Sequence, residues 1–140
     1  MPDLIHHMLE LPVPMKDLYE WLEDPAVGAI MAPAKEVVEV NRNKNGRVES
    51  FKTNRGTVQY VLHDYPQRWV AEYHWRGYRA DYDVRLQSFG DPWTRLIVDC
   101  NIQPQSFMGR LFGTRTWERV KGYLNRRLEA LQKHFNPRPD

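Results

Sequence analysis

A change of hydrophobic period at Pro104 constrains most strongly how this chain can fold. Between residues 35 and 103 apolar side chains recur at alternate positions, which is typical of half-buried β-strands. Beyond Pro104 they recur at intervals of three and four, which predicts one amphipathic helix of several turns. This helical stripe comprises Trp117, Val120, Leu124, Leu128, Leu131 and Phe135. A run of strands followed by a helix places the chain in the α+β class.

Seven strands are expected, joined by short turns. The first, LIHHMLELP, precedes a short helix in MKDLYEWLEDP, which Pro25 ends because proline cannot continue a helix. The other six strands cover residues 35–42, 47–53, 57–64, 67–75, 78–88 and 93–103. Asn45-Gly46 is a strong hairpin signal, and short connections between consecutive strands imply an antiparallel meander. Ser106 can cap the last helix, whose first half is weakened by Gly109, Gly113 and Gly122.

The sheet should have one apolar and one charged face. The apolar positions of three strands are Trp69, Ala71, Tyr73, Trp75, Tyr78, Ala80, Tyr82, Val84, Leu86, Leu96, Val98, Cys100 and Ile102. The apolar sheet face and the helix stripe are expected to bury each other. One helix, about 10 Å across, is too slim to fill the concavity of seven twisted strands, so an apolar hollow should remain.

The order of these elements resembles the START-like, or SRPBCC, superfamily. The resemblance is carried by LPVPMKDLYEWLEDP at 11–25, DPWTRLIVDCNIQP at 91–104 and GRLFGTRTWERVKGYLNRRLEALQKHF at 109–135. It implies a helix-grip fold: a seven-stranded curved antiparallel sheet around a long C-terminal helix, with a short helical insertion after the first strand. We expect one domain over residues 1–135 and a flexible tail over 136–140. The superfamily includes polyketide cyclases and dehydratases, lipid transfer domains and coenzyme Q-binding proteins, so the resemblance carries no catalytic identity.

The ligand site is expected inside the hollow, where tyrosine and tryptophan combine apolar area with a polar group that orients an amphipathic ligand. The alternative is that these aromatics only fill the core. The expected lining residues are His7, Met31, Tyr60, Tyr73, Trp75, Tyr82, Phe112 and Trp117, with Met31 near the mouth. Loop 24–34 and the weak helix start around Gly109 and Gly113 form the expected gate.

His7 is the best candidate for acid–base chemistry. It shares the parity of Ile5, Leu9 and Leu11, so its imidazole should point into the cavity, as a ligand contact, a catalytic group or a satisfied core residue. His63 and His74 have the opposite parity to their strands' apolar residues and are expected on the surface.

Other reactive groups have structural interpretations. Asp81 and Asp83 alternate with arginines on the wet face and are expected to form a solvated charge row. Cys100 lies in an apolar run and is expected to be a small core residue. The histidines have no metal-ligand spacing and no glycine-rich phosphate loop is present, so neither a metal nor a cofactor is expected. Without a signal peptide or membrane-spanning segment, a cytoplasmic location is expected.

Three functions stay open on the sequence. The first is binding or carriage of a hydrophobic small molecule, such as a lipid, an isoprenoid or a polyketide-like compound, in the cavity. The second is a cyclase- or dehydratase-like enzyme using an acid–base group there. The third is an interaction module, because residues 104–140 carry 8 basic and 3 acidic side chains that could contact RNA, the ribosome, an anionic membrane or a protein. A solvated outer helix face is the plainer interpretation of these charges.

Overall fold

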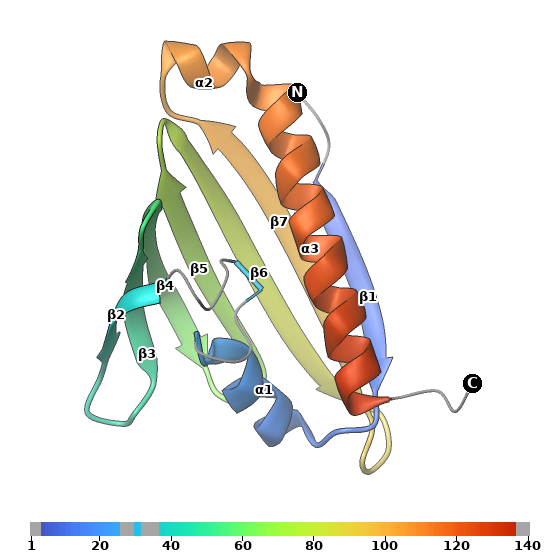
Figure 1. Cartoon of the computed structure of the whole chain (residues 1–140). Helices are drawn as coiled ribbons and strands as arrows, with labels where there is room; N and C mark the ends of the chain where they lie inside the picture. Colours follow the sequence, from blue (N-terminus) through green and yellow to red (C-terminus); the bar gives the residue numbers. More distant parts are fainter. Residues whose placement is uncertain (1–3, 26–29, 32–36, 137–140) are drawn as a thin grey trace.

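The computed structural model describes residues 4–25, 30–31 and 37–136 of the chain. Its elements are β1 (Ile5–Leu11), α1 (Met15–Glu23), β2 (Val37–Arg42), β3 (Val48–Thr53), β4 (Gly56–Asp64), β5 (Arg68–Trp75), β6 (Tyr78–Ser88), β7 (Thr94–Pro104), α2 (Phe107–Leu111) and α3 (Gly113–Phe135). Figure 1 shows a curved sheet with α1 and α3 on its concave side. The predicted class is confirmed: a seven-stranded antiparallel sheet, a short helix after the first strand and a long terminal helix.

The strands form one sheet in the order β1-β7-β6-β5-β4-β3-β2. Strands β2 to β7 are a meander, and β1 closes the opposite edge by pairing with β7, from Ile5 opposite Cys100 to Leu11 opposite Thr94. Burial alternates along β5, β6 and β7, as the period of two predicted. The outer face carries the predicted charge row, in which Asp83 accepts two hydrogen bonds from Arg68 at 3.0 and 2.8 Å.

Helix α1 fills one end of the hollow. Its spacing of apolar residues buries Leu18, Tyr19 and Leu22 completely, and these side chains belong to the main core. Ile30 and Met31, which follow in the chain, are also buried. The hollow is therefore closed at the α1 end by the protein's own side chains.

Helix α3 runs along the other side of the concave face, against β1 and β7 (Figure 1). Leu124, Leu128 and Leu131 in its second half are buried, whereas no residue described in its first half is. The predicted weak point is confirmed, because the helical segment is broken at Phe112 into α2 and α3. Ser106 caps α2 by accepting a hydrogen bond from the Gly109 amide at 3.0 Å. In the first half of α3, Trp117 and Val120 pack against the core while partly exposed, and part of the sheet beside them stays uncovered.

Some predictions fall on residues that the structure does not describe. Residues 26–29 and 32–34 of the expected gate, residues 35 and 36 of the second strand, and residues 137–140 of the expected tail lie outside the described ranges.

Candidate functional site

The uncovered part of the concave face forms two adjoining grooves. The first has a volume of about 470 Å³ and the second about 760 Å³, within the range of small-molecule sites. Four residues line both: Arg55, Trp75, Thr116 and Arg119. The two grooves are therefore neighbouring parts of one opening between the sheet and the first half of α3.

The sheet side of this opening is aromatic. Tyr73, Trp75 and Tyr78 follow one another along the β5–β6 hairpin, with ring centroids 4.9 Å and 5.6 Å apart. Small residues lie beside them, since Ala80 pairs with Tyr73 and Ala71 pairs with Tyr82. A row of aromatic rings flanked by alanines leaves a hollow with a broad apolar floor.

The helix side of the opening is a stripe on α3 and the residue before it. Its main members are spaced by four, three, four and three residues, so they share one helix face: Phe112, Thr116, Arg119, Tyr123 and Arg126. Glu118, Val120 and Gly122 beside them also line the first groove. This stripe is rotated by one position from the core stripe of Leu124, Leu128 and Leu131. One helix thus presents a dry face to β1 and β7 and a polar face to the groove.

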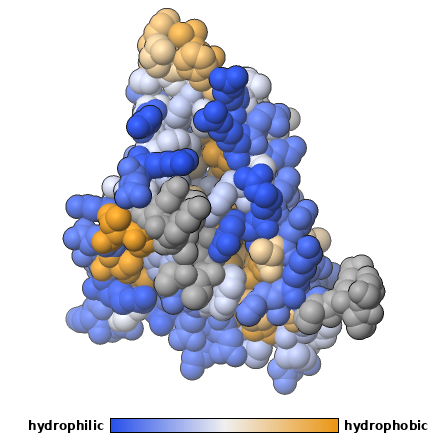
Figure 2. Space-filling model, viewed as in Figure 1, coloured by the Kyte–Doolittle hydropathy of each residue, from blue (hydrophilic) through white to orange (hydrophobic). Residues whose placement is uncertain are grey.

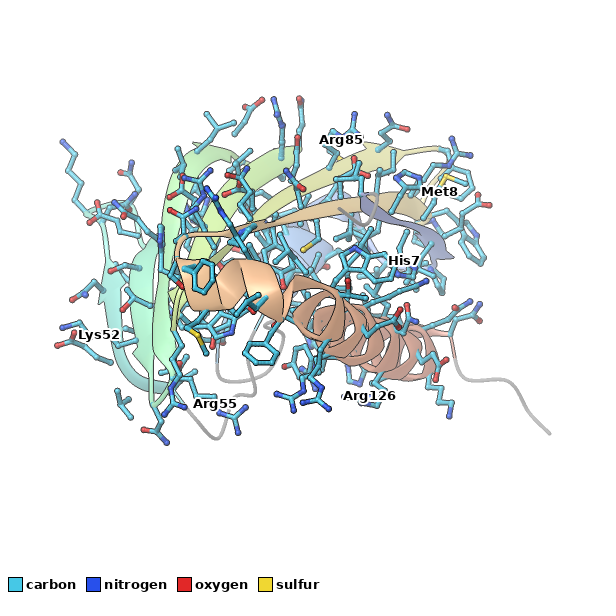
Figure 3. The ribbon with its side chains drawn as sticks, turned by 90° about the horizontal axis from the view of Figure 1, so that it is seen from above. His7, Met8, Lys52, Arg55, Arg85 and Arg126 are labelled. Carbon is cyan, nitrogen blue, oxygen red and sulfur yellow. The ribbon has the colours of Figure 1, made fainter. Side chains whose placement is uncertain are left out.

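Arginines dominate the charge around the opening. The arginines in the two linings are Arg55, Arg76, Arg115, Arg119 and Arg126, and among the described lining residues Glu118 alone is acidic. Arg55 and Arg76 come from the β3–β4 and β5–β6 turns, which lie at the same end of the sheet. Figure 3 shows Arg55 and Arg126 on the side of the sheet where α3 lies, and Arg85 on the outer face.

The sequence pattern alone does not indicate that these arginines line the grooves. Arg115, Arg119 and Arg126 are exposed, as expected for a solvated helix face, and they also line the grooves. The signal was present in the spacing from Phe112 to Arg126, which is as regular as the core stripe. The sequence could not say which of the two stripes faces the sheet.

Tyr82 and Cys100 lie side by side beneath the first groove. Burial raises the pKa of the Tyr82 hydroxyl well above its ordinary value, and the adjacent Cys100 raises it further. Burial likewise raises the pKa of the Cys100 thiol to about 12, partly offset by its hydrogen bond with Tyr82. The floor near Tyr82 is therefore neutral at physiological pH, so the charge in the groove comes from its rim.

The predicted site residues fall into two groups. Met31, Tyr73, Trp75 and Tyr82 line the first groove and Phe112 lines the second. His7, Tyr60 and Trp117 do not belong to either described lining. Trp117 packs against the core, with the Lys121 ammonium 4.8 Å from its ring centroid.

His7 lies between β1 and α3 (Figure 3), on the concave side as its parity predicted. Burial is the main cause that lowers its pKa from 6.5, and the charges of His6 and Lys121 lower it further, while Asn125 opposes the shift. The imidazole is thus neutral at neutral pH. Because it lies outside the described groove linings, its use as an acid–base group stays a prediction.

Tyr60 and His63 belong to a separate buried polar cluster beside α1. A β-bulge between Tyr60 and Leu62 shifts the register of β4 and turns His63 inward, so the predicted surface position of His63 is wrong. His63 donates to the Val48 carbonyl oxygen at 2.6 Å and accepts from the Tyr19 hydroxyl at 2.6 Å. Tyr60 stacks on His63 with centroids 4.8 Å apart. His74, by contrast, is exposed and bonded to Glu72, as predicted for a surface residue.

Glu23 is the charged centre of this cluster. Its side chain is 3% exposed, its carboxylate lies 2.8 Å from the Arg47 guanidinium, and it accepts a hydrogen bond from the Val48 amide at 3.2 Å. The contacts of Glu23 and His63 join α1 to β3 and β4, which favours a structural role for the cluster.

Metal-binding clusters and membrane-spanning helices are both absent from the described part of the chain. Within it, no three histidine, cysteine, aspartate or glutamate side chains are close enough together to hold a metal ion. None of its helices combines the length and apolar character needed to cross a bilayer.

Solved structures of low sequence identity share this architecture. A START superfamily protein from Mycobacterium smegmatis is 13% identical with a TM-score of 0.58, over 91% of this chain and 98% of that chain. CalU16 from Micromonospora echinospora is 14% identical with a TM-score of 0.55, over 94% and 80%. An HSP90 activator from Plasmodium falciparum is 17% identical with a TM-score of 0.58, over 75% and 76%. No family model and no curated protein matches the sequence. At these identities the likeness concerns the fold alone.

Proposed function

We propose that this chain, which has the START-like helix-grip fold, binds an amphipathic small molecule with an apolar, ring-bearing body and an anionic group. The observation that carries the proposal is the pairing of an aromatic floor with an arginine rim in one opening. The fold provides the hollow, and the side chains lining it define the chemistry of the occupant.

The floor supports the apolar part of the proposal. Tyr73, Trp75 and Tyr78 offer ring faces in a row, on which a planar or isoprenoid body can pack. The first groove, at about 470 Å³, accommodates a molecule of a few rings or a folded chain.

The rim supports the anionic part. Arg119 lines both grooves and has Arg55 and Arg115 as neighbours in the second lining. Guanidinium groups bind carboxylate, sulfonate and phosphate oxygens through paired hydrogen bonds. Several guanidinium groups around one opening repel one another, and a bound anion relieves that repulsion.

Two dyes that differ in one charged group test the apolar part and the anionic part of the proposal separately. Anilinonaphthalene sulfonate carries an anionic group on an aromatic body, and phenylnaphthylamine has the same kind of body without the charge. We expect both dyes to bind with enhanced fluorescence, and the sulfonate to bind about tenfold more tightly. Arg119→Gln should remove most of that difference and leave the neutral dye unaffected. Arg85→Gln, an arginine paired with Asp99 on the outer face, is the matched control and should change neither affinity.

A substitution that fills the first groove tests whether the dyes bind there. Gly122 lines the first groove, and a Cβ atom added there has only the Arg126 guanidinium near it, at 3.4 Å. Gly122→Leu should weaken both dyes at least about tenfold while the thermal midpoint stays equal or rises, because leucine favours a helix more than glycine does. Gly113→Leu adds the same group to α3 where nothing lies within 4 Å, and should leave affinity unchanged. If Gly122→Leu binds both dyes as the wild type does, the first groove is not the binding site.

A further inference from the structure

Helix α2 and the residue after it, Phe112, expose an unusual set of large apolar side chains. Four residues in six positions are largely accessible: Phe107 at 74%, Met108 at 58%, Leu111 at 59% and Phe112 at 48%. In the space-filling view (Figure 2) they form the hydrophobic cap at the top of the molecule, over α2. Single exposed apolar residues are ordinary, whereas a contiguous cluster indicates a binding surface.

The cause of this exposure lies in how α2 is docked. Gly109 is the buried residue of α2, and a Cβ atom there would lie 2.6 Å from the Gly77 carbonyl oxygen in the β5–β6 turn. Because the helix touches the sheet through a glycine, its bulky neighbours are directed outward. The packing of Gly109 against the β5–β6 turn therefore keeps these side chains exposed to solvent.

The charges around this apolar tip are positive. Arg110 lies within α2, Arg115 follows it at the start of α3, and Arg76 is in the turn that supports α2. The charged residues described in the lining of the second groove are all arginines: Arg55, Arg76, Arg115 and Arg119. An apolar cap surrounded by arginine complements an anionic bilayer, where acyl chains receive the cap and headgroups receive the guanidinium groups.

A second copy of the chain fits this surface less well. Two tips meeting face to face would bring Arg110 and Arg115 of one copy against the same arginines of the other, and like charges at short range repel. The tip also projects from the end of the molecule in Figure 1, a shape that reaches a flat surface without obstruction.

We propose that α2 is a membrane-docking tip, with Phe107 and Leu111 inserting into the interface of an anionic bilayer and Arg110 and Arg115 contacting its headgroups. Met108 and Phe112 line the second groove as well as belonging to the tip, so the groove opens where the bilayer would lie. Docking by itself does not depend on the proposed ligand. Exchange of that ligand with the bilayer does rest on the proposed function.

Vesicle flotation tests the docking. The wild-type chain should float with vesicles of equimolar phosphatidylcholine and phosphatidylglycerol, bind pure phosphatidylcholine vesicles at least about tenfold less, and be released as salt rises. Phe107→Ser combined with Leu111→Ser should lower partitioning into the anionic vesicles at least about tenfold. Arg110→Glu should reduce it as well, through charge alone.

The control replaces two exposed apolar side chains elsewhere on the molecule. Val38 and Val61, 65% and 59% exposed on β2 and β4, lie far across the sheet from α2, and Val38→Ser combined with Val61→Ser should leave flotation unchanged. Phe107 and Leu111 line neither described groove, so the tip variant should retain wild-type dye affinity, which separates failure of docking from failure of the groove. The docking proposal is overturned if the wild type does not float with anionic vesicles. It is also overturned if the tip double variant floats as well as the valine double variant does. Concentration-dependent dimers abolished by the tip variant would identify a second copy as the occupant instead.

Discussion

Burial decides the chemistry of Cys100. Its side chain is fully buried on β7, and desolvation of the thiolate raises its pKa from 9.0 to about 12. The thiol is therefore a core group at physiological pH, and the site chemistry does not involve its nucleophilicity.

This shift predicts a pH dependence of stability. Because the native pKa lies above the unfolded one, the contribution of the thiol is complete below about pH 9 and is lost as pH rises toward 12. Stability should fall in that window by up to about 1.4 kcal/mol per pH unit from this group. Urea unfolding at about pH 8 and about pH 10 measures it, and Cys100→Ala, whatever its own stability, should show a smaller loss. Equal losses in both proteins would refute the assignment.

Glu23 shows that a buried charge can be structural. The Arg47 guanidinium and the Val48 amide bind its carboxylate, and the Arg47 side chain is 19% exposed, so solvent screens part of the pairing. We expect Glu23→Gln to lower the free energy of unfolding by about 1–3 kcal/mol, because a partly buried cation loses its counter-charge. Urea denaturation measures the change.

Glu39→Gln is the matched control for this prediction. Glu39 is half exposed, with a carboxylate oxygen 3.4 Å from the Lys52 ammonium. Its replacement should cost less than about 0.5 kcal/mol. Similar effects of the two substitutions would show that the cluster beside α1 contributes no more than a surface pair does.

At the scale of elements, α2 is held by a contact between two glycines. The Gly109 site is crowded by the Gly77 carbonyl oxygen, whereas Gly113, four residues later, has nothing within 4 Å of an added Cβ. The same substitution should therefore have opposite effects at the two positions. Gly109→Ala should destabilise the protein by about 1–3 kcal/mol through the clash, and Gly113→Ala should stabilise it by up to about 1 kcal/mol through helix propensity.

Thermal and urea unfolding of both alanine variants measure these effects. A stabilising Gly109→Ala would mean that α2 can move off the β5–β6 turn without loss, and the tip would then not be rigidly presented.

At the scale of the whole molecule, stability should be unevenly distributed. The second half of α3 buries Leu124, Leu128 and Leu131, whereas its first half lines an open groove. We expect amide hydrogens of residues 114–122 to exchange at least about tenfold faster than those of residues 124–131. Hydrogen exchange with mass spectrometry measures this gradient.

Ligand binding should change the rates of hydrogen exchange along the same helix. Saturating anilinonaphthalene sulfonate is expected to slow exchange in residues 114–122 selectively, because the proposed site places the dye against that wall of the groove. Uniform protection along α3 without the dye would contradict the division of the helix into a core half and a groove half.

Much of the candidate site could be predicted for the strands and little of it for the helix. The period of two placed Tyr73, Trp75 and Tyr82 on the concave face, where the structure has them in or beneath the groove. It failed at His63, because one extra residue in β4 inverts the parity after Tyr60 and no local signal marks the bulge. A strand pattern is reliable only while its register is unbroken.

The sequence by itself determined the elements and their faces, since alternation and helical spacing depend on neighbours a few residues apart. It also determined that one helix cannot fill the hollow of seven strands. Only the tertiary structure decided that β1 pairs with β7, that α3 lies along that edge, and that Arg119 faces the groove. These features depend on how the helix is rotated and placed against the sheet. That placement is fixed by packing between residues far apart in the chain, which no local pattern contains.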